Sequence, residues 1–105
     1  MHHFWWCHVP NGGARTKAEA GIFKALGVMA GVADILIIPQ GGKSHWVEIK
    51  PKGRYQSESQ RAFEGVMIAL GCPYRVVRGV DEVDAALREW GVISPLTTRQ
   101  MDEVA

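Results

Sequence analysis

In some stretches of the chain the pattern of hydrophobic and polar residues is typical of strands, and in others apolar residues recur at helical spacing. In residues 3–9 alternate side chains would fall on two faces, which is typical of a strand. The glycine-containing stretch 10–13 then predicts a turn. Residues 34–38, 45–50 and 74–78 predict three further strands. The short connection 40–44 predicts that the middle two form a hairpin.

Three other stretches have apolar residues at helical spacing and predict helices. The first two begin with capping-box patterns, Thr16-x-x-Glu19 and Ser57-x-x-Gln60, and the third begins with Asp81 as its cap. The faces that we expect these helices to bury contain, in chain order, Ile22, Phe23 and Leu26, then Phe63, Val66, Met67 and Leu70, then Val83, Ala86, Leu87 and Trp90.

The predicted order is strand, helix, strand, strand, helix, strand, helix. This order predicts an α/β fold with a mixed central sheet flanked by helices and the hairpin at its centre. The 105 residues suit one domain, for which we expect residues 1–93, followed by a polar tail over 94–105. A 47% share of hydrophobic residues is enough for a core, and a 22% share of charged residues argues against disorder. With no long apolar run and no signal-peptide pattern, we expect a cytoplasmic location.

The formal net charge of +1 says nothing about a nucleic-acid partner, but the distribution of charge says more. Residues 43–61 hold five basic side chains against two acidic ones, which would suit either a polyanion-binding patch or a solvated loop. The two cysteines, Cys7 and Cys72, lack the spacing of a zinc site. We expect free thiols, although one disulfide is possible.

Three residues of the predicted hairpin point to chemistry. Glu48 and Lys50 would share one face of their strand, and Asp34 begins the strand beside it, so the hairpin would bring Asp34 next to Glu48. Neighbouring carboxylates repel each other unless a cation lies between them, and Mg²⁺ favours one or two carboxylates with waters and phosphate oxygens. The carbonyl of Ile49 could add a ligand, and Lys50 could position or deprotonate a metal-bound water. The alternative is a solvated Glu–Lys pair and an aspartate that only caps a strand.

The ordered motifs resemble the PD-(D/E)xK nuclease signature and, more narrowly, the VRR-NUC (virus-type replication-repair nuclease) domain. The resemblance implies a restriction-endonuclease-like core and a Mg²⁺- or Mn²⁺-dependent endonuclease that hydrolyses DNA phosphodiester bonds in a bacterial or phage-infected cell. It further implies branched substrates such as four-way (Holliday) junctions. We also expect a homodimer, because a two-fold dimer would place two active sites on two strands of a symmetric junction. The motifs that carry the resemblance are residues 8–13, 24–28, 31–34, 47–50 and 57–63.

The resemblance also implies roles for particular residues. Asp34 and Glu48 would be metal ligands together with the backbone carbonyl of Ile49, and Lys50 would be the catalytic lysine. Gln60 would be the family's helix glutamine beside the site, and its place on the apolar helix face agrees with an inward orientation. The alternative is that Gln60 is only the second half of the capping box.

The chain departs from the family pattern at two points. Ala33 stands where the family usually has proline, and the family's N-terminal helix, which usually carries a glutamate, is apparently missing. Glu19 is the one early acidic candidate, and its position does not match the motif. The acid could be dispensable, or another subunit could supply it.

Several further residues have both a functional and a structural interpretation. The expected DNA-binding residues are Lys43, Lys52, Arg54, Arg61, Asn11 and His8, although Asn11 could simply form the turn and His8 could simply pack. Trp5, Trp6, Trp46 and Tyr55 could stack on bases, or lie in the core or in a subunit interface. His45 is expected at the surface. The alternative functions are a non-catalytic DNA-binding or assembly protein on the same fold, and a flap or nicking nuclease.

Overall fold

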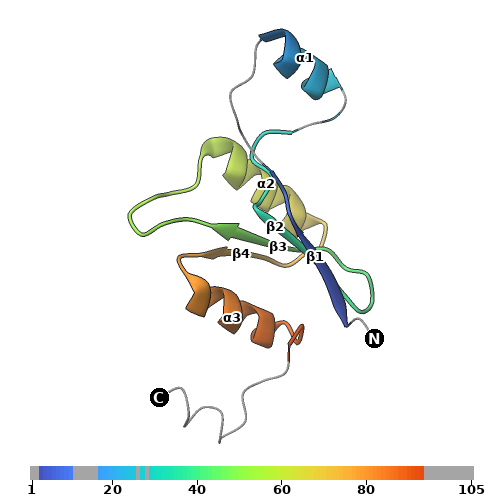
Figure 1. The fold of residues 1–105 in the computed structure, drawn as a ribbon, viewed down its shortest axis with the longest axis vertical. Coiled ribbons are helices and arrows are strands. Elements are labelled where there is room, and N and C mark those ends of the chain that lie inside the picture. The colour runs from blue at the N-terminus through green and yellow to red at the C-terminus, as the bar shows by residue number, and fades with distance from the viewer. Residues whose placement is uncertain (1–2, 11–16, 26, 28, 94–105) are drawn as a thin grey trace, which may run out of the picture.

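A four-stranded sheet forms the centre of the computed structural model, which describes residues 3–10, 17–25, 27 and 29–93. Its strands lie in the order β1 (Phe4–His8), β2 (Ile35–Pro39), β3 (His45–Ile49) and β4 (Tyr74–Val77). The pairs β1–β2 and β2–β3 are antiparallel, and β4 is parallel to β3 (Figure 1). The predicted strands and the central hairpin β2–β3 are therefore confirmed.

Three helices complete the fold: α1 (Lys17–Ala25), α2 (Glu58–Ala69) and α3 (Val80–Glu89). The helix α2 is the crossover that the parallel pair β3–β4 requires. In Figure 1 α2 and α3 lie on opposite sides of the sheet, and α1 lies apart from it. The sequence correctly predicts this α/β architecture and the order of its elements.

The face of the sheet that α3 covers contains the apolar core. Ile37, Val47 and Val77 are buried there because the strand registers place them on one face. The partly buried side chains that pack against this cluster include Val83, Leu87 and Trp90. The predicted apolar face of the last helix is thus confirmed.

The face that α2 covers is aromatic and polar. Trp46 lies opposite Tyr74 in the register, and Phe63 of α2 meets the Trp46 ring edge-on at 5.0 Å between centroids. The expected burial of Val66 and Leu70 is wrong, since these side chains are 54% and 70% exposed. The half-buried row of α2 is instead Gln60, Phe63, Glu64 and Met67. The helix is rotated so that two polar side chains face the sheet where polar groups already lie.

Three smaller expectations are also wrong. Ile22, expected on the buried face of the first helix, is 61% exposed. Gly79, and not Asp81, is the N-cap of α3, and Asp81 lies in the first turn, where its charge suits the helix dipole. His45 is only 8% exposed, because strand alternation places it with Val47 on the α3 face. Its ring meets that of Trp90 at 5.1 Å, and its Nδ1 lies 2.9 Å from the Lys43 carbonyl oxygen.

Some expectations concern residues that the structure does not describe. The turn at residues 11–13, the cap at Thr16, Leu26 and the tail over 94–105 lie outside the described residues. Cys7 and Cys72 are half-buried free thiols, as expected. Within the described ranges, no helix has the length and apolar character needed to cross a bilayer.

Candidate functional site

The residues expected to carry chemistry meet at one end of the sheet, where β2 begins and β3 ends. The register pairs Ile35 with Val47, so one further step along both strands sets Asp34 opposite Glu48. The Asp34 carboxylate accepts a hydrogen bond through Oδ2 from the Ile49 N–H at 2.7 Å. The structure therefore brings Asp34 to the end of β3, at the position that the hairpin requires.

Glu48 is the most unusual residue of the described chain. Glu48 is wholly buried, at 0% exposure, on the face of the sheet that α2 covers. Neither carboxylate oxygen makes a hydrogen bond of good geometry with a described residue, although the Tyr74 hydroxyl lies close enough to interact with it. A buried polar group without a partner is destabilising by about 1–3 kcal/mol, and more when it is charged. Such a group indicates either a strained site or a site for a ligand.

The polar groups around Glu48 are also poorly satisfied. The Tyr74 hydroxyl, the Gln56 amide nitrogen and the Trp46 indole nitrogen are buried, and none makes a hydrogen bond of good geometry with a described residue. The Tyr74 hydroxyl nevertheless lies close enough to Gln56 and Glu48 to interact with both. Burial, and then the nearby Glu48 charge, raise the pKa of the Tyr74 hydroxyl far above its ordinary value, against the opposing effect of Gln56. A carboxylate, a hydroxyl and an amide therefore lie close together with unused hydrogen-bonding capacity.

Gly31 allows the segment before β2, which contains Asp34, to pack closely against the start of α2. A Cβ at Gly31 would lie 2.4 Å from the backbone carbon and oxygen of Ser59, and Gly31 has a φ of +86°. Both observations require glycine. Two residues later Ala33 is completely buried. The close backbone packing at Gly31 thus sets where Asp34 enters the sheet.

Gln60 forms the capping box that the sequence pattern predicts. Its Oε1 accepts from the Ser57 N–H at 2.7 Å, and the Ser57 hydroxyl accepts from the Gln60 N–H at 3.2 Å. The side chain is half-buried at the start of α2. Its oxygen is therefore engaged in the cap, and its amide NH₂ is the part left for another partner.

Lys50 follows β3 directly. Its backbone N–H donates to the Val77 carbonyl at 2.9 Å, so the chain stays in register with β4 through this residue. Strand alternation then places its side chain on the same face as Glu48. Lys50 is half-buried as a residue, and its ammonium group forms no ion pair with any described residue.

The loop that follows Lys50 carries two further basic residues at this end of the sheet. Lys52 and Arg54 are exposed there. The Arg78 guanidinium, at the end of β4, donates to the Pro51 carbonyl at 3.2 Å and to the Arg54 carbonyl. It also lies 6.0 Å from the centre of the Tyr55 ring. Arg78 thus holds the loop in place and adds a positive charge to this end of the sheet.

The other expected DNA-binding residues are scattered. Arg61 donates to the Gln56 carbonyl at 2.9 Å and so supports the chain before α2. His8 lies at the carboxylate end of the sheet, but strand alternation places it on the α3 face. Lys43 lies before β3, at the opposite end of the sheet. Asn11 is outside the described residues.

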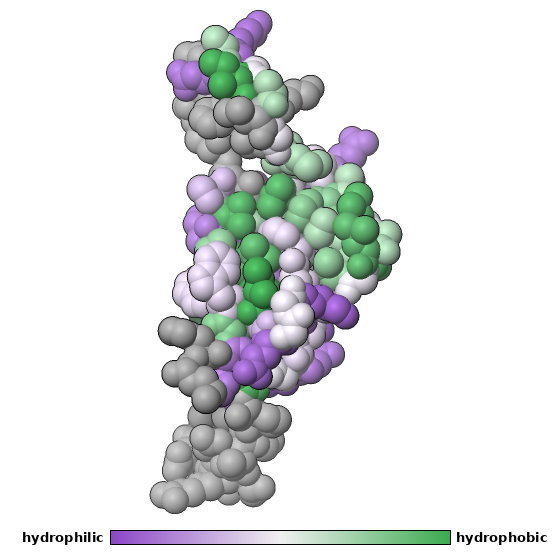
Figure 2. All heavy atoms as spheres, turned by 90° about the vertical axis from the view of Figure 1, so that its right-hand side faces the viewer, coloured by the Kyte–Doolittle hydropathy of each residue, from purple (hydrophilic) through white to green (hydrophobic). Residues whose placement is uncertain are grey.

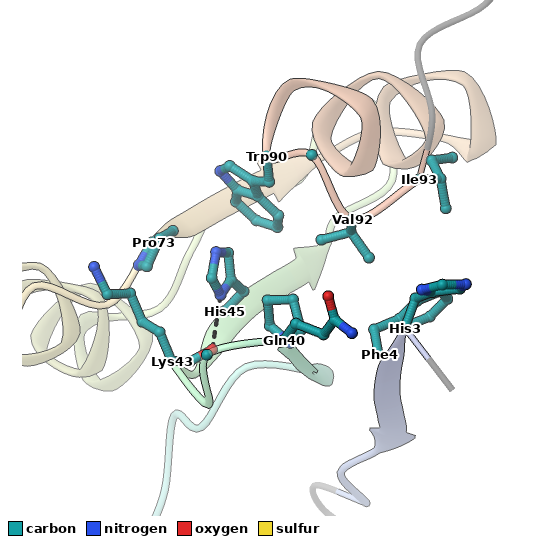
Figure 3. A pocket seen from close by; sticks show the side chains of 12 residues that line it. His3, Phe4, Gln40, Lys43, His45, Pro73, Trp90, Val92 and Ile93 are labelled. Carbon is teal, nitrogen blue, oxygen red and sulfur yellow. Dashed lines mark hydrogen bonds between the residues drawn. The ribbon is translucent and has the colours of Figure 1, made fainter. Parts of the chain in front are cut away.

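A hollow on the described surface lies away from the two carboxylates. This open groove of about 960 Å³ lies at the other end of the sheet, on the α3 face (Figure 3). The side chains drawn around it include Phe4, Lys43, His45 and Trp90. The site at Glu48 therefore has to be argued from its buried polar groups and not from a cavity.

A divalent cation can be tested against the groups present. No three His, Cys, Asp or Glu side chains gather into a metal-binding group in the described part of the chain. Asp34 and Glu48 nevertheless supply carboxylate oxygens, and the Ile49 carbonyl points to the same side of β3 as the N–H that Asp34 accepts. This donor set suits Mg²⁺, which keeps several waters and uses few protein ligands, and the unpartnered oxygens of Glu48 are consistent with it.

Sequence reasoning did not single out Tyr74, Gln56 or Arg78 for this site. The parallel pairing of β4 with β3 brings Tyr74 and Arg78 to it, and the only signal in the sequence is their place at the two ends of the last strand. A comparison of the chain with protein-family models, curated proteins and solved structures found no match. Its function is therefore argued from its own residues.

Proposed function

We propose that the protein is a metal-dependent endonuclease that hydrolyses phosphodiester bonds of DNA, with branched DNA such as a four-way junction as its substrate. The observation that carries the proposal is Glu48, which is buried next to the strand position of Asp34 with neither carboxylate oxygen in a hydrogen bond of good geometry with a described residue. The resemblance of residues 31–34 and 47–50 to the PD-(D/E)xK signature supports the same assignment.

In this proposal Asp34, Glu48 and the Ile49 carbonyl hold Mg²⁺ or Mn²⁺. The bound cation would polarise the scissile phosphate and offset the negative charge that develops on it. The Asp34 carboxylate uses one oxygen to accept from the Ile49 N–H, which fixes its orientation. The Lys50 ammonium, on the face of Glu48, would orient the attacking water or stabilise charge on the phosphate.

The charge of the surrounding loop supports a phosphate-backbone substrate. Lys52 and Arg54 are exposed beside the carboxylates, and Arg78 holds the backbone of their loop. Contacts of this kind recognise the position and shape of a nucleic acid and carry no base sequence. A small domain with such contacts suits a substrate that is distinguished by its branched shape.

The test is a cleavage assay on four-way junction, flap, single-stranded and duplex DNA in Mg²⁺, Mn²⁺ or chelator. We expect cation-dependent cleavage of the junction, and we expect Asp34→Ala and Glu48→Ala to lose at least about 10²-fold in rate while junction binding persists. Asp84→Ala, which removes an exposed carboxylate that pairs with Arg88, is the matched control and should cut normally. Salt-sensitive junction binding without cleavage in any cation would favour a non-catalytic DNA-binding protein.

Lys50 has a separate expected signature. Lys50→Ala should stop cleavage and leave binding of the cation in place, because an ammonium group is not a metal ligand. Lys43→Ala is the matched control, since Lys43 lies at the other end of the sheet. Loss of cation binding in the Lys50 variant, with cleavage retained, would exclude the role assigned to Lys50.

A further inference from the structure

The outer edge of β1 is open among the described residues. β1 is the first strand of the sheet and pairs only with β2. Its sequence, Phe-Trp-Trp-Cys-His, contains no Lys, Glu, Asp or Pro, the residues that commonly protect an edge strand from pairing with another chain. Trp5 and Trp6 are 56% and 58% exposed, on opposite faces of the strand. Exposed aromatic side chains on an unprotected edge need a partner.

The hydrogen bonds to β2 show which backbone groups of β1 are left over. The Val9 N–H donates to the Asp34 carbonyl at 2.7 Å, and the His3 carbonyl accepts from the Gln40 N–H at 3.2 Å. Because strand residues alternate in direction, the odd-numbered residues bond to β2. The N–H and C=O groups of Phe4, Trp6 and His8 therefore point away from the sheet.

We propose that β1 pairs with β1 of a second copy of this chain, antiparallel about a two-fold axis at Trp6. In this register Trp6 pairs with Trp6 of the second copy, and Phe4 pairs with His8 in both directions. All outward N–H and C=O groups of these three residues are then used, in six hydrogen bonds. No other partner is needed to explain the edge, because the strand is complementary to itself in this register.

The side chains agree with this pairing. On the α2 face Trp5 would lie opposite Cys7 of the second copy, and on the α3 face the two Trp6 indoles would be neighbours. In Figure 2, apolar and weakly polar residues dominate the middle of the side that lies at the right of Figure 1, where the start of β1 is found. An aromatic side chain buries about 150–250 Å² when covered, so two half-exposed tryptophans per copy plus the paired strands would bury on the order of 1,000 Å² in total. That area is at the lower limit for a specific interface, and a micromolar dimer is expected.

The pairing also places the two carboxylate sites. A two-fold axis perpendicular to the sheet leaves both copies of Glu48 on the same face of a continuous eight-stranded sheet. The β3 strands would be five strand spacings apart, or about 24 Å, and Glu48 lies three residues along from the level of Trp6 in opposite directions. The two sites would therefore be about 30 Å apart. Only the use of these sites to cut two DNA strands depends on the proposed function.

The first test compares Trp6→Pro with Trp6→Val by sedimentation equilibrium, from about 1 to 100 μM, without DNA or metal. Both changes remove the indole, and only proline removes the outward N–H, while the bonds to β2 remain. We expect the wild type to be a dimer, and we expect the dimer dissociation constant of the proline variant to be at least tenfold higher than that of the valine variant. A wild-type monomer, or equal dissociation of the two variants, would overturn the proposal.

The second test keeps the proposal falsifiable if the proline variant does not fold. In a Cys72→Ser background, Trp5→Cys sets a new thiol opposite Cys7 of the second copy at a non-hydrogen-bonded pair, where a disulfide fits. We expect a disulfide-linked dimer on a non-reducing gel, and no such dimer when Cys7→Ser is added. Cross-linking that is independent of Cys7, or its absence, would exclude this register. Asp34→Ala should dimerise normally, so a failure of the nuclease proposal is distinguishable from a failure of the interface.

Discussion

Replacing Glu48 with glutamine should stabilise the protein when divalent cations are absent. The Glu48 side chain is fully buried and neither of its oxygens is hydrogen-bonded among the described residues. Glu48→Gln removes the charge, keeps the shape and adds an amide donor close to the Tyr74 hydroxyl. Since an unsatisfied buried polar group is destabilising by about 1–3 kcal/mol, we expect the free energy of unfolding in chelator to rise by about that amount. For a domain of this size the gain corresponds to roughly 5–15 °C in Tm.

The same substitution should abolish the response to Mg²⁺. A cation that binds only the folded protein adds about 1.4 kcal/mol of stability at a concentration ten times its Kd. We expect this increase for the wild type and none for Glu48→Gln. The stability advantage of Glu48→Gln over the wild type in chelator should therefore shrink or reverse when Mg²⁺ is added.

Urea unfolding followed by circular dichroism, with chelator and with Mg²⁺, measures both effects. Glu89→Gln is the control, because Glu89 is a glutamate 64% exposed in a surface pair with Arg75. Loss of the Glu89 charge should change the free energy of unfolding by less than about 1 kcal/mol and leave the increase of stability in Mg²⁺ intact. If Glu48→Gln were less stable than the wild type in chelator, the Glu48 carboxylate would have a stabilising partner and the reasoning would fail.

The remaining predictions concern the groups around Glu48. Tyr74→Phe should weaken Mn²⁺ binding, measured by calorimetry, by about tenfold or more, because a group that orients a metal ligand typically contributes 10–100-fold to affinity. Tyr55→Phe is the control: it removes a hydroxyl from a residue that is 80% exposed, and it should leave Mn²⁺ affinity unchanged. Burial raises the pKa of Tyr74 above its ordinary value of 10.0, so the unfolded chain loses this proton first, and stability should fall as pH rises above about 10 in the wild type and less so in Tyr74→Phe. Gly31→Ala should lower the free energy of unfolding in urea by about 1–3 kcal/mol more than Gly53→Ala. The two φ values are +86° and +85°, and only the Gly31 Cβ would meet backbone, so equal costs would contradict the close packing at Ser59.

The sequence predicted those parts of the fold that depend on local pattern. Short alternating or apolar runs predicted the four strands, and Ser57-x-x-Gln60 predicted a capping box that the structure contains. The sequence also predicted the part of the site that lies within the hairpin, because one antiparallel register places Asp34 opposite Glu48. The assignment of a nuclease function to these residues stays a prediction.

Other features depend on contacts between distant segments and could not be predicted. Tyr74 reaches Glu48 only because β4 returns parallel to β3, and His45 is buried only because α3 ends at Trp90 above it. A helical repeat indicated which residues of α2 are apolar, but not how the helix is rotated. The packing of Gly31 on Ser59 and the polar groups under Gln60 and Glu64 select that rotation, which leaves Val66 exposed.

The two ends of the sheet differ in a way that favours a functional interpretation of Glu48. At the start of β3 the buried polar residue, His45, has a hydrogen-bonding neighbour in the Lys43 carbonyl and packs on Trp90, so its burial is compensated. At the end of β3 the carboxylate of Glu48 makes no hydrogen bond of comparable geometry with a described residue, although the Tyr74 hydroxyl lies close enough to feel its charge. One buried polar side chain is satisfied and another is left unsatisfied three residues along the same strand, so the backbone geometry of that strand is not what limits the second. The unsatisfied end is better explained by a requirement for open ligand positions, which a bound cation would fill.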